Sequence, residues 1–485
     1  MRRAITSTDI DQLLSLLRDT DALISEPHDE SYKESVKRWS AAAERPAGVA
    51  VVPTDASQIS IILRYAAANK IDLAIRGGGH STSGSSSTDG GLLIDLRAIR
   101  HVKVNAANKS VKVGGGANWG DVDTETVKYG FATVGGTISD TGVGGLTLGG
   151  GYGWLSGAHG IAIDNLLSAT VVLPSGDIVR ASDNENQDLF WGLRGAGQNF
   201  GVVVEFEFKL HRQGNLWTGT LAFPPSPPVV HKLVEAVNDL YCPRTPEGRS
   251  KYAGRAASVI NILRPSDAGG KVALAVAVMF NGTEEEGREA FKGLYDIGPV
   301  MESVRSVPYD IANQTLSATP GFRVSMKGAA WALPLQTALL QELIASYTHF
   351  TEAIPDMESS MILLECYDPY VVATGATNSD MSFANRGWHM NASIQPSWTK
   401  QEFDAEGRKW ARDTTALFEK WFEKIGTPSR SGDYGSVLAY GNYDHYDQKN
   451  SRDIFGRNYT RLQELKAKYD PYNMFDKLFA VHQKE

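Results

Sequence analysis

The sequence predicts an α+β fold divided between two large lobes. At 485 residues the chain is too long for one small core, which makes two lobes the expected arrangement. The first 200 residues mix strand-like and helix-like patterns in the manner of an α+β protein. The composition shifts near residue 212, where a proline-rich stretch, FPPSPPVV at 223–230, leads into a second unit.

The N-terminal part begins with a helix and continues through short strands. Apolar residues recur at helical spacing over 8–24, and a buried strand follows at 47–53. Asp55 can cap the next helix. The chain then predicts strands at 72–75, 90–96 and 102–113, a helix over 116–130, and strands at 168–173 and 202–210.

The middle of the chain alternates between strands and helices, and the end is aromatic. We expect strands at 258–263, 272–279, 360–366 and 387–395. Helices are expected at 229–241, 284–295, 334–349 and 400–424, with a last one at 457–468.

Charge and composition exclude several classes of function. The net charge is −8 and there is no long basic run, so nucleic-acid binding is not expected. No apolar run reaches the length of about 18 residues that a membrane span needs. The basic start is followed by no apolar stretch, so we expect no signal peptide. Together with only two cysteines, Cys242 and Cys366, this predicts an intracellular, cytoplasmic protein.

The first motif is the glycine run of residues 76–81, Arg-Gly-Gly-Gly-His-Ser, between two predicted strands. Three consecutive glycines let successive backbone N–H groups face one side, which makes an anion site suited to a pyrophosphate. Arg76 can add positive charge there. A tight turn between strands would need only one or two glycines, and the Ser/Thr-rich residues after His80 add further donors.

The second motif is residues 141–154, which contain seven glycines in fourteen positions. On propensity this composition predicts a loop rather than a helix or strand. A flexible linker would not interleave Val, Leu, Tyr and Trp with the glycines, so a buried loop against a flat cofactor fits better. A Rossmann loop is rejected, because after Gly195 and Gly197 the third glycine, Gly201, comes one position late.

Four segments in order resemble one flavoprotein family. They are RGGGHS at 76–81, GVGGLTLGGGYGWLSGAHGIAIDN at 142–165, DLFWGLRGAGQNFGVV at 188–203 and ELKAKYDPYNMF at 464–475. Together they resemble the berberine bridge enzyme-like branch of the vanillyl-alcohol oxidase family. This resemblance implies a two-lobed fold with a PCMH-type FAD-binding domain and a substrate domain of antiparallel sheet covered by helices.

The resemblance also implies domain limits and cofactor contacts. Residues 1–210 would form the N-terminal part of the FAD-binding domain, 211–424 the substrate-binding domain, and 425–485 a segment that returns to the FAD-binding domain. His80 would carry the covalently attached FAD. The other implied contacts are Arg76, Gly77, Gly78, Gly79, Ser81, Thr141, Gly142, Gly145, Gly149, Gly150, Gly153, Gly160, Ile161 and Val203.

Two departures from the family pattern change these expectations. Many relatives carry a cysteine that makes a second flavin bond, and that position is Ile138 here, so we expect a single link at His80. The family's oxygen-access position falls at Thr141. The tail after Phe475 lacks the family's Asn-rich end, which puts its flavin contacts in doubt.

Candidates for the catalytic base lie in three places. Family resemblance points to the Tyr440-Gly-Asn-Tyr443 stretch, with Tyr443 first and Tyr440 its neighbour, and a base role would need a depressed tyrosine pKa. Glu365 and His389, on predicted strands of the substrate domain, are the alternatives. A structural or substrate-contact role is favoured for His389, and cofactor contact for His159. No spacing of ligands predicts a metal site.

These features predict an FAD-dependent oxidase that acts on a small molecule and uses O₂. The expected substrate is an alcohol, amine or phenolic compound of secondary metabolism. An FAD-dependent oxidative cyclisation or coupling enzyme shares every motif, so the sequence leaves it open, with carbohydrate oxidation as a remoter alternative. A flavin-free binding protein on the same scaffold is disfavoured by the intact RGGGHS motif.

Overall fold

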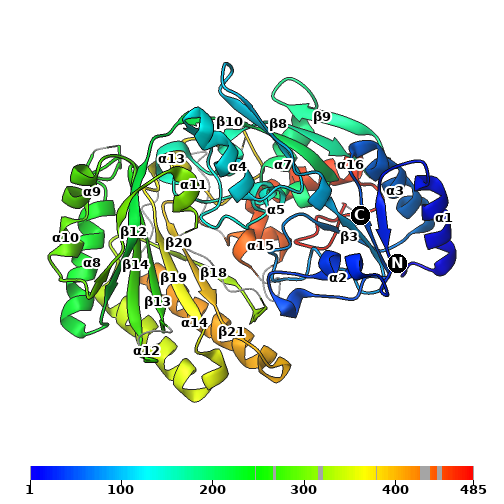
Figure 1. Ribbon diagram of the computed structural model, residues 1–485. Helices are drawn as coiled ribbons and strands as arrows, with labels where there is room; N and C mark the ends of the chain where they lie inside the picture. The colour runs from blue at the N-terminus through cyan, green and yellow to red at the C-terminus, as the bar shows by residue number, and fades with distance from the viewer. Residues whose placement is uncertain are drawn as a thin grey trace.

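Two lobes lie side by side in the computed structural model, with the chain termini on the N-terminal lobe (Figure 1). The structure describes residues 2–245, 247–265, 269–314, 321–377, 379–425, 437, 439–444 and 450–483. We call residues 2–212 together with 450–483 the N-terminal lobe, and residues 216–425 the central lobe.

A four-stranded sheet forms the outer part of the N-terminal lobe. Its strand order is β1-β2-β4-β3, in which β4 runs parallel to both β2 and β3, and β2 is buried throughout. Asp55 caps the helix after β2, as the sequence predicts, by accepting from the amides of Ser57 and Gln58. The elements of this layer are α1 (Ser7–Leu17), β1 (Leu23–Ser25), α2 (Glu30–Val36), β2 (Val49–Val52), α3 (Ala56–Asn69), β3 (Leu73–Arg76) and β4 (Leu92–Asp95).

A second sheet of five antiparallel strands completes this lobe, in the order β5-β6-β10-β8-β9. The single strand expected over 102–113 is instead a hairpin. The chain reverses just before β6, where Lys109 adopts a φ of 51°. The strands are β5 (Val102–Asn105), β6 (Ser110–Gly114), β8 (Leu166–Val172), β9 (Ile178–Ser182) and β10 (Val202–Lys209); α4 (Trp119–Thr126) and the β7–β11 pair (Phe131–Ala132, His211–Arg212) lie beside them.

The central lobe is built on one large antiparallel sheet, ordered β15-β12-β14-β13-β19-β20-β18, with β16 also paired to β12. The expected strands near 258, 272, 360 and 390 are present, whereas β12 and β18 had not been expected. The strands are β12 (Leu216–Phe223), β13 (Ala256–Leu263), β14 (Ala273–Phe280), β15 (Met301–Glu302), β16 (Arg305–Val307), β18 (Lys327–Trp331), β19 (Met361–Cys366) and β20 (Met390–Gln395); a small pair joins β17 (Arg323–Val324) to β21 (Ser397–Trp398).

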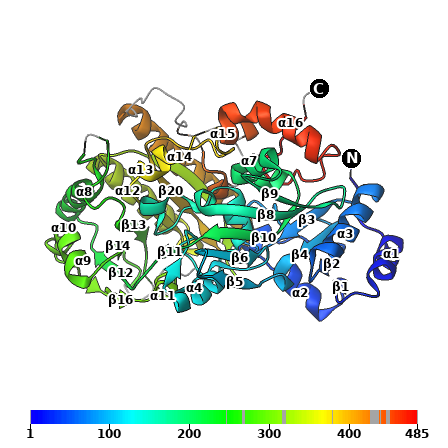
Figure 2. The same ribbon diagram turned by 90° about the horizontal axis from the view of Figure 1, so that it is seen from above.

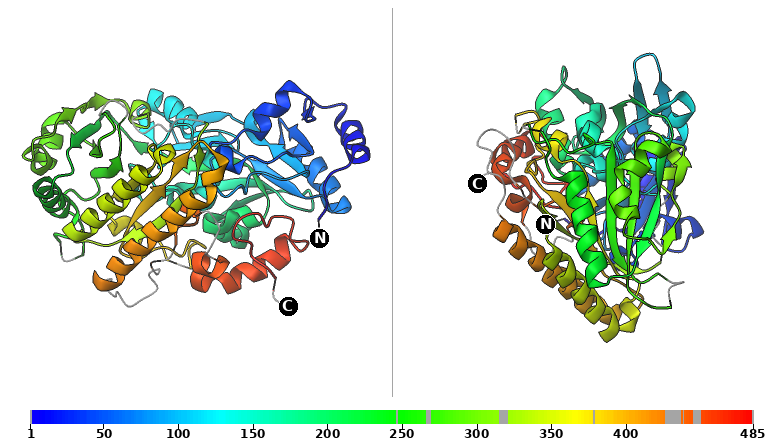
Figure 3. Two further views of the ribbon diagram at one scale, coloured as in Figure 1. Left: turned by 90° about the horizontal axis from the view of Figure 1, so that it is seen from below. Right: turned by 90° about the vertical axis from the view of Figure 1, so that its left-hand side faces the viewer.

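Helices cover one face of this sheet and leave the other face to the N-terminal lobe. The long helices α12 and α14 run side by side along the sheet when the molecule is seen from below (Figure 3, left). Because strand residues alternate between faces, Ile260, Ile262 and Leu364 pack under the helices, whereas Val259, Asn261 and Leu363 face the other way. The helices of this lobe are α8 (Pro227–Tyr241), α9 (Glu284–Ala290), α10 (Lys292–Tyr295), α11 (Tyr309–Ala312), α12 (Thr337–Ala353), α13 (Tyr370–Thr374) and α14 (Asp404–Ile425).

The glycine-rich segment 141–154 departs from its prediction as a loop without helix. Helix α5 (Val143–Leu148) forms within it. Its Val143 is fully buried, and α5 packs against α7 (Gln187–Ala196), so tertiary burial outweighs the poor helix propensity of glycine. The short helix α6 (Ser156–His159) follows it. Among the described residues, no helix is long and apolar enough to cross a membrane.

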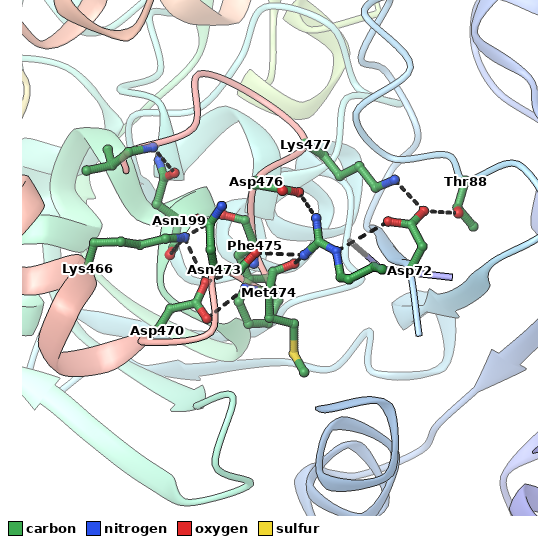
Figure 4. A network of polar contacts seen from close by, with 12 residues as sticks. Asp72, Thr88, Asn199, Lys466, Asp470, Asn473, Met474, Phe475, Asp476 and Lys477 are labelled. Carbon is green, nitrogen blue, oxygen red and sulfur yellow. Dashed lines mark hydrogen bonds and ion pairs between the residues drawn. The ribbon is translucent and has the colours of Figure 1, made fainter. Parts of the chain in front are cut away.

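The C-terminal segment returns to the N-terminal lobe, where α15 (Ser451–Phe455) and α16 (Tyr459–Tyr469) lie beside α7 (Figure 2). A polar network fixes the turn after α16 (Figure 4). Lys466, which is fully buried, donates to Asp470 at 2.7 Å, to the Asn199 carbonyl and to the Phe475 carbonyl. Asp470 also accepts from the backbone amides of residues 474 and 475. This turn therefore depends on one buried ion pair.

Replacing Lys466 with methionine should destabilise the protein strongly. The side chains of Lys466 and Asp470 are both 0% exposed, so the change leaves a buried carboxylate without its cation. Losing one partner of such a pair costs about 3–5 kcal/mol. Chemical denaturation of the purified protein measures the loss. The control is Lys468→Met on the same helix, where an exposed pair with Asp188 is expected to contribute less than about 1 kcal/mol. Equal effects of the two changes would contradict this account.

Candidate active site

A cavity of about 550 Å³ lies between the two lobes. The N-terminal lobe contributes residues of 73–86, 136–148, 198–206 and 474–478 to its wall, and the central lobe contributes the uncovered face of its sheet. Residues 440–444 also line the cavity. A cavity of this size, mainly apolar with a few polar groups, is typical of a ligand or cofactor site.

The glycine run after β3 forms one side of this cavity. Residues 77–81 all line it, and Gly79 has a φ of 76°, a conformation that glycine adopts readily. A Cβ added at Gly78 would lie 2.5 Å from the backbone nitrogen of Gly142, so the two glycine-rich segments touch through their backbones. Arg76 does not line the cavity. Its guanidinium pairs with the buried Asp95 at 3.1 Å instead, which neutralises the charge that the sequence suggested for a ligand.

His80 is held from two sides. Its ring stacks on Trp39, with ring centroids 5.4 Å apart, and its Nε2 lies 3.3 Å from a carboxylate oxygen of Asp140. Burial alone would raise the pKa of Asp140, but the hydrogen bond and the charge of His80 outweigh it and lower that pKa. Because Nε2 faces Asp140, Nδ1 is the ring nitrogen left for a ligand in the cavity that His80 lines.

The predicted contacts of the second glycine segment divide into two groups. Thr141, Gly142 and Gly145 line the cavity, as does Val203 on β10. The other members of the predicted set do not line it, and at each glycine among them an added side chain would meet neighbouring atoms. A Cβ would approach Asn442 at Gly149, Phe383 at Gly150, the Gly135 carbonyl at Gly153 and Asp164 at Gly160, while Ile161 is buried in the core.

Tyr443 and Glu365 form a hydrogen-bonded pair that faces the cavity. The Tyr443 hydroxyl donates to Oε1 of Glu365, a residue of β19, at 2.6 Å. Burial raises the pKa of Glu365 to about 7, even though the hydrogen bond from Tyr443 lowers it. Burial and the nearby Glu365 raise the pKa of Tyr443 well above its ordinary value. The depressed pKa that a base role for Tyr443 requires is therefore not found, and Glu365 is the better proton acceptor.

Tyr440 anchors this pair to the glycine-rich segment. Its hydroxyl accepts from the backbone amide of Gly151 at 3.0 Å and from the Asn442 side chain at 2.9 Å. Its ring packs edge-on against Tyr443, with centroids 4.8 Å apart. Burial raises the pKa of Tyr440, which disfavours a role as a base.

Neither His389 nor His159 lines the cavity. His389 is buried, bonds through Nδ1 to the Gly387 carbonyl at 2.9 Å and does not line the cavity. Burial lowers its pKa to about 4. His159 also lies outside the cavity wall and stacks on His211 at 3.7 Å. No cluster of metal-binding side chains occurs in the described ranges.

Several site residues could not be named from the sequence. Trp39 and Asp140 hold His80, but neither belongs to a recognisable motif. Asn442, within the Tyr-Gly-Asn-Tyr stretch, is the exception, because its neighbours already marked it. The tail also contributes, since Phe475 and Lys477 line the cavity, although its family-like flavin contacts were in doubt.

Comparison with known proteins identifies the family. The FAD binding domain family matches residues 47–182, and the berberine and berberine like family matches residues 439–477. The FAD-linked oxidoreductase pgmH of Aspergillus terreus is 31% identical over 490 residues, covering 99% of this chain and 96% of its own length.

Solved structures show the same fold. The 6-hydroxy-D-nicotine oxidase of Arthrobacter nicotinovorans superimposes with a TM-score of 0.78 at 24% identity, covering 96% of this chain and 98% of its own. The BBE-like 1 protein of Physcomitrella patens superimposes with a TM-score of 0.82 at 18% identity, covering 98% of this chain and 99% of its own.

The cavity residues fit an FAD. At Gly78 and Gly142 a side chain would collide with the backbone of the other glycine segment, so glycine at both positions lets the two segments meet in one cavity wall of exposed main chain. On the central-lobe side of the cavity, Oε2 of Glu365 is buried and has no hydrogen-bond partner among the described residues, which is typical of a group that binds a ligand. The fold, the paired glycine segments and the relatives agree: this chain belongs to the berberine bridge enzyme-like family of FAD-linked oxidoreductases, with a PCMH-type FAD-binding domain.

Proposed function

We propose that the protein is an oxidase that converts a small alcohol or amine of secondary metabolism to the corresponding carbonyl or imine. The substrate loses a hydride and a proton, and both are finally transferred to O₂, so the overall reaction is substrate-H₂ + O₂ → product + H₂O₂. The observation that carries the proposal is the Tyr443–Glu365 pair in the cavity, because removal of a hydride from an alcohol or amine also needs a proton acceptor.

The bound FAD supplies the hydride acceptor. The chain itself manages the proton. With a pKa of about 7, Glu365 is partly ionised near neutral pH and can take a proton at that pH. Tyr443 donates its hydroxyl proton to Oε1 of Glu365, which leaves its oxygen lone pairs for the substrate O–H or N–H. A proton can thus pass from substrate to Tyr443 as the Tyr443 proton moves to Glu365.

A substrate panel tests the oxidase. Aromatic and aliphatic alcohols and amines are supplied to the holoenzyme in air, and H₂O₂ and the organic product are both quantified. The expected result is one H₂O₂ for each carbonyl or imine formed. A ring-closed or coupled product would instead establish the cyclisation activity, and turnover without H₂O₂ would exclude the oxidase.

We also propose that His80 carries the FAD as its only covalent link. Its place in the cavity wall and the orientation of Nδ1 support the attachment. The position of the cysteines supports a single link, because Cys366 is fully buried and neither it nor Cys242 lines the cavity.

His80→Ala should release the flavin when the protein is denatured, whereas the wild type should retain it. Acid precipitation followed by absorbance of pellet and supernatant measures the covalent fraction. The matched control is the double change Cys242→Ser with Cys366→Ser, which should leave that fraction unchanged. Yellow colour that leaves the wild-type pellet entirely, or a flavin-bearing cysteine peptide, would refute this assignment.

A further inference from the structure

The sheet face that closes the cavity carries both apolar and polar side chains, and its centre is apolar. Leu363 of β19 lies at its centre, with Val259 and Leu263 on β13 beside it. Among the residues that these strands turn toward the cavity, Glu365 is the single ionisable one. This wall therefore disfavours a substrate that carries a charge where it contacts the sheet.

The other charges around the cavity have partners. Lys477 pairs with Asp72 at 2.5 Å, and Asp444 pairs with Lys327 at 3.1 Å. Because both lysines are already paired, neither Lys477 nor Lys327 is available to bind an anionic substrate. These pairs favour an uncharged substrate whose specificity comes from hydrogen bonds.

Asn261 is one of four uncharged polar residues that the strands of the sheet turn toward the cavity, the others being Thr220, Ser393 and Gln395. Asn261 lines the cavity directly opposite Leu363 and is 4% exposed. Its Nδ2 donates to the carbonyls of Val259 and Ala275 at 3.1 and 3.0 Å. Because a carbonyl can only accept, these two bonds fix which atom of the amide is nitrogen. The remaining atom, Oδ1, is an acceptor with no donor among the described residues.

The strand register sets the spacing between this acceptor and the reacting groups. Glu365 lies opposite Val259, two residues along from the Asn261–Leu363 pair and on the same face of the sheet. Side chains related by such a diagonal are about 7–8 Å apart. Asn261 and Glu365 can therefore contact opposite ends of one substrate about as long as an aromatic ring, with Leu363 beneath it.

We propose that Asn261 determines specificity by binding a second O–H or N–H donor at the end of the substrate away from the oxidised group. This inference rests on the oxidase function proposed above and narrows its substrate to an uncharged, ring-sized alcohol or amine that carries such a distal donor. A bound substrate without such a donor displaces water from Oδ1 and leaves this acceptor unpaired, which is unfavourable. Its affinity is lowered about tenfold or more for that reason.

The test measures binding and not turnover, so that the two proposals can fail separately. Two ketones that resemble oxidation products and cannot be oxidised at the same position are titrated into the holoenzyme by calorimetry. They are 4-hydroxyacetophenone, which has a distal donor, and 4-methylacetophenone, in which a methyl group of similar size replaces it. The wild type should bind the hydroxyl compound at least about tenfold more tightly.

Asn261→Leu removes the acceptor at similar size and should abolish this preference. Asn261→Ala is a second variant with the same expectation, and flavin absorbance shows which variants retain FAD. The matched control is Ser393→Ala, on β20 at the opposite side of Leu363, which should keep the preference. A wild type that binds both ketones equally or binds neither, or a preference that survives in the Asn261 variants, overturns the inference. If the preference depends on Asn261 but the corresponding alcohols yield no H₂O₂, the oxidase proposal fails alone.

Discussion

Tyr443→Phe should slow substrate oxidation by about 10²–10⁴-fold, the usual cost of removing a group that takes part in proton transfer. The change deletes the hydroxyl that donates to Glu365 at 2.6 Å and keeps the ring that packs against Tyr440. It therefore separates the proton path from aromatic packing. Stopped-flow absorbance of the bound flavin, recorded without oxygen, isolates the step to which Tyr443 contributes.

The same variant should also shift the pH dependence. The hydrogen bond from Tyr443 lowers the pKa of Glu365, so its loss should raise that pKa above about 7 and move the residual activity to higher pH. Tyr440→Phe is the matched control, because its hydroxyl bonds to Gly151 and Asn442 rather than to Glu365. A near wild-type rate in Tyr443→Phe, with normal flavin content, would remove Tyr443 from the mechanism.

Much of the fold could be predicted because burial imposes regular patterns on the sequence. The strands at β13 and β19 were visible as short apolar runs, and Asp55 marked the start of α3. Helix α5 was not predicted, because local propensity argues against a helix among so many glycines. Its stability comes from contacts with α7, which are distant in sequence and cannot be read from composition.

The candidate site was predicted as separate residues and not as an arrangement. Glu365 and Tyr443 were both named as possible bases, but their hydrogen bond joins positions 78 residues apart. Burial raises the pKa of both groups, and the nearby carboxylate makes ionisation of the Tyr443 phenol harder still. Asn261 carried no sequence signal at all, because its role follows from strand register and from two side-chain bonds to backbone carbonyls.

Glu365→Gln should lower the rate of substrate oxidation by at least as much as Tyr443→Phe, because it removes the final proton acceptor while keeping side-chain size. In the wild type, the rate should rise with pH and level off above about 7 as the carboxyl ionises. In Glu365→Gln this dependence on a group near pH 7 should disappear, leaving a low rate throughout.

Stability provides an independent check on the same carboxyl. Its pKa is raised from about 4.5 to about 7 in the folded state, so between these pH values the folded protein binds more protons than the unfolded chain. Its contribution to stability therefore falls as pH rises through this window and is constant above it. Relative to wild type, Glu365→Gln should gain melting temperature between pH 5 and pH 8. Glu365 would be excluded as the base by a wild-type rate profile without an ionisation near pH 7, or by a variant that keeps the wild-type profile. A difference in melting temperature that is the same at pH 5 and pH 8 would show that the pKa of Glu365 is not raised.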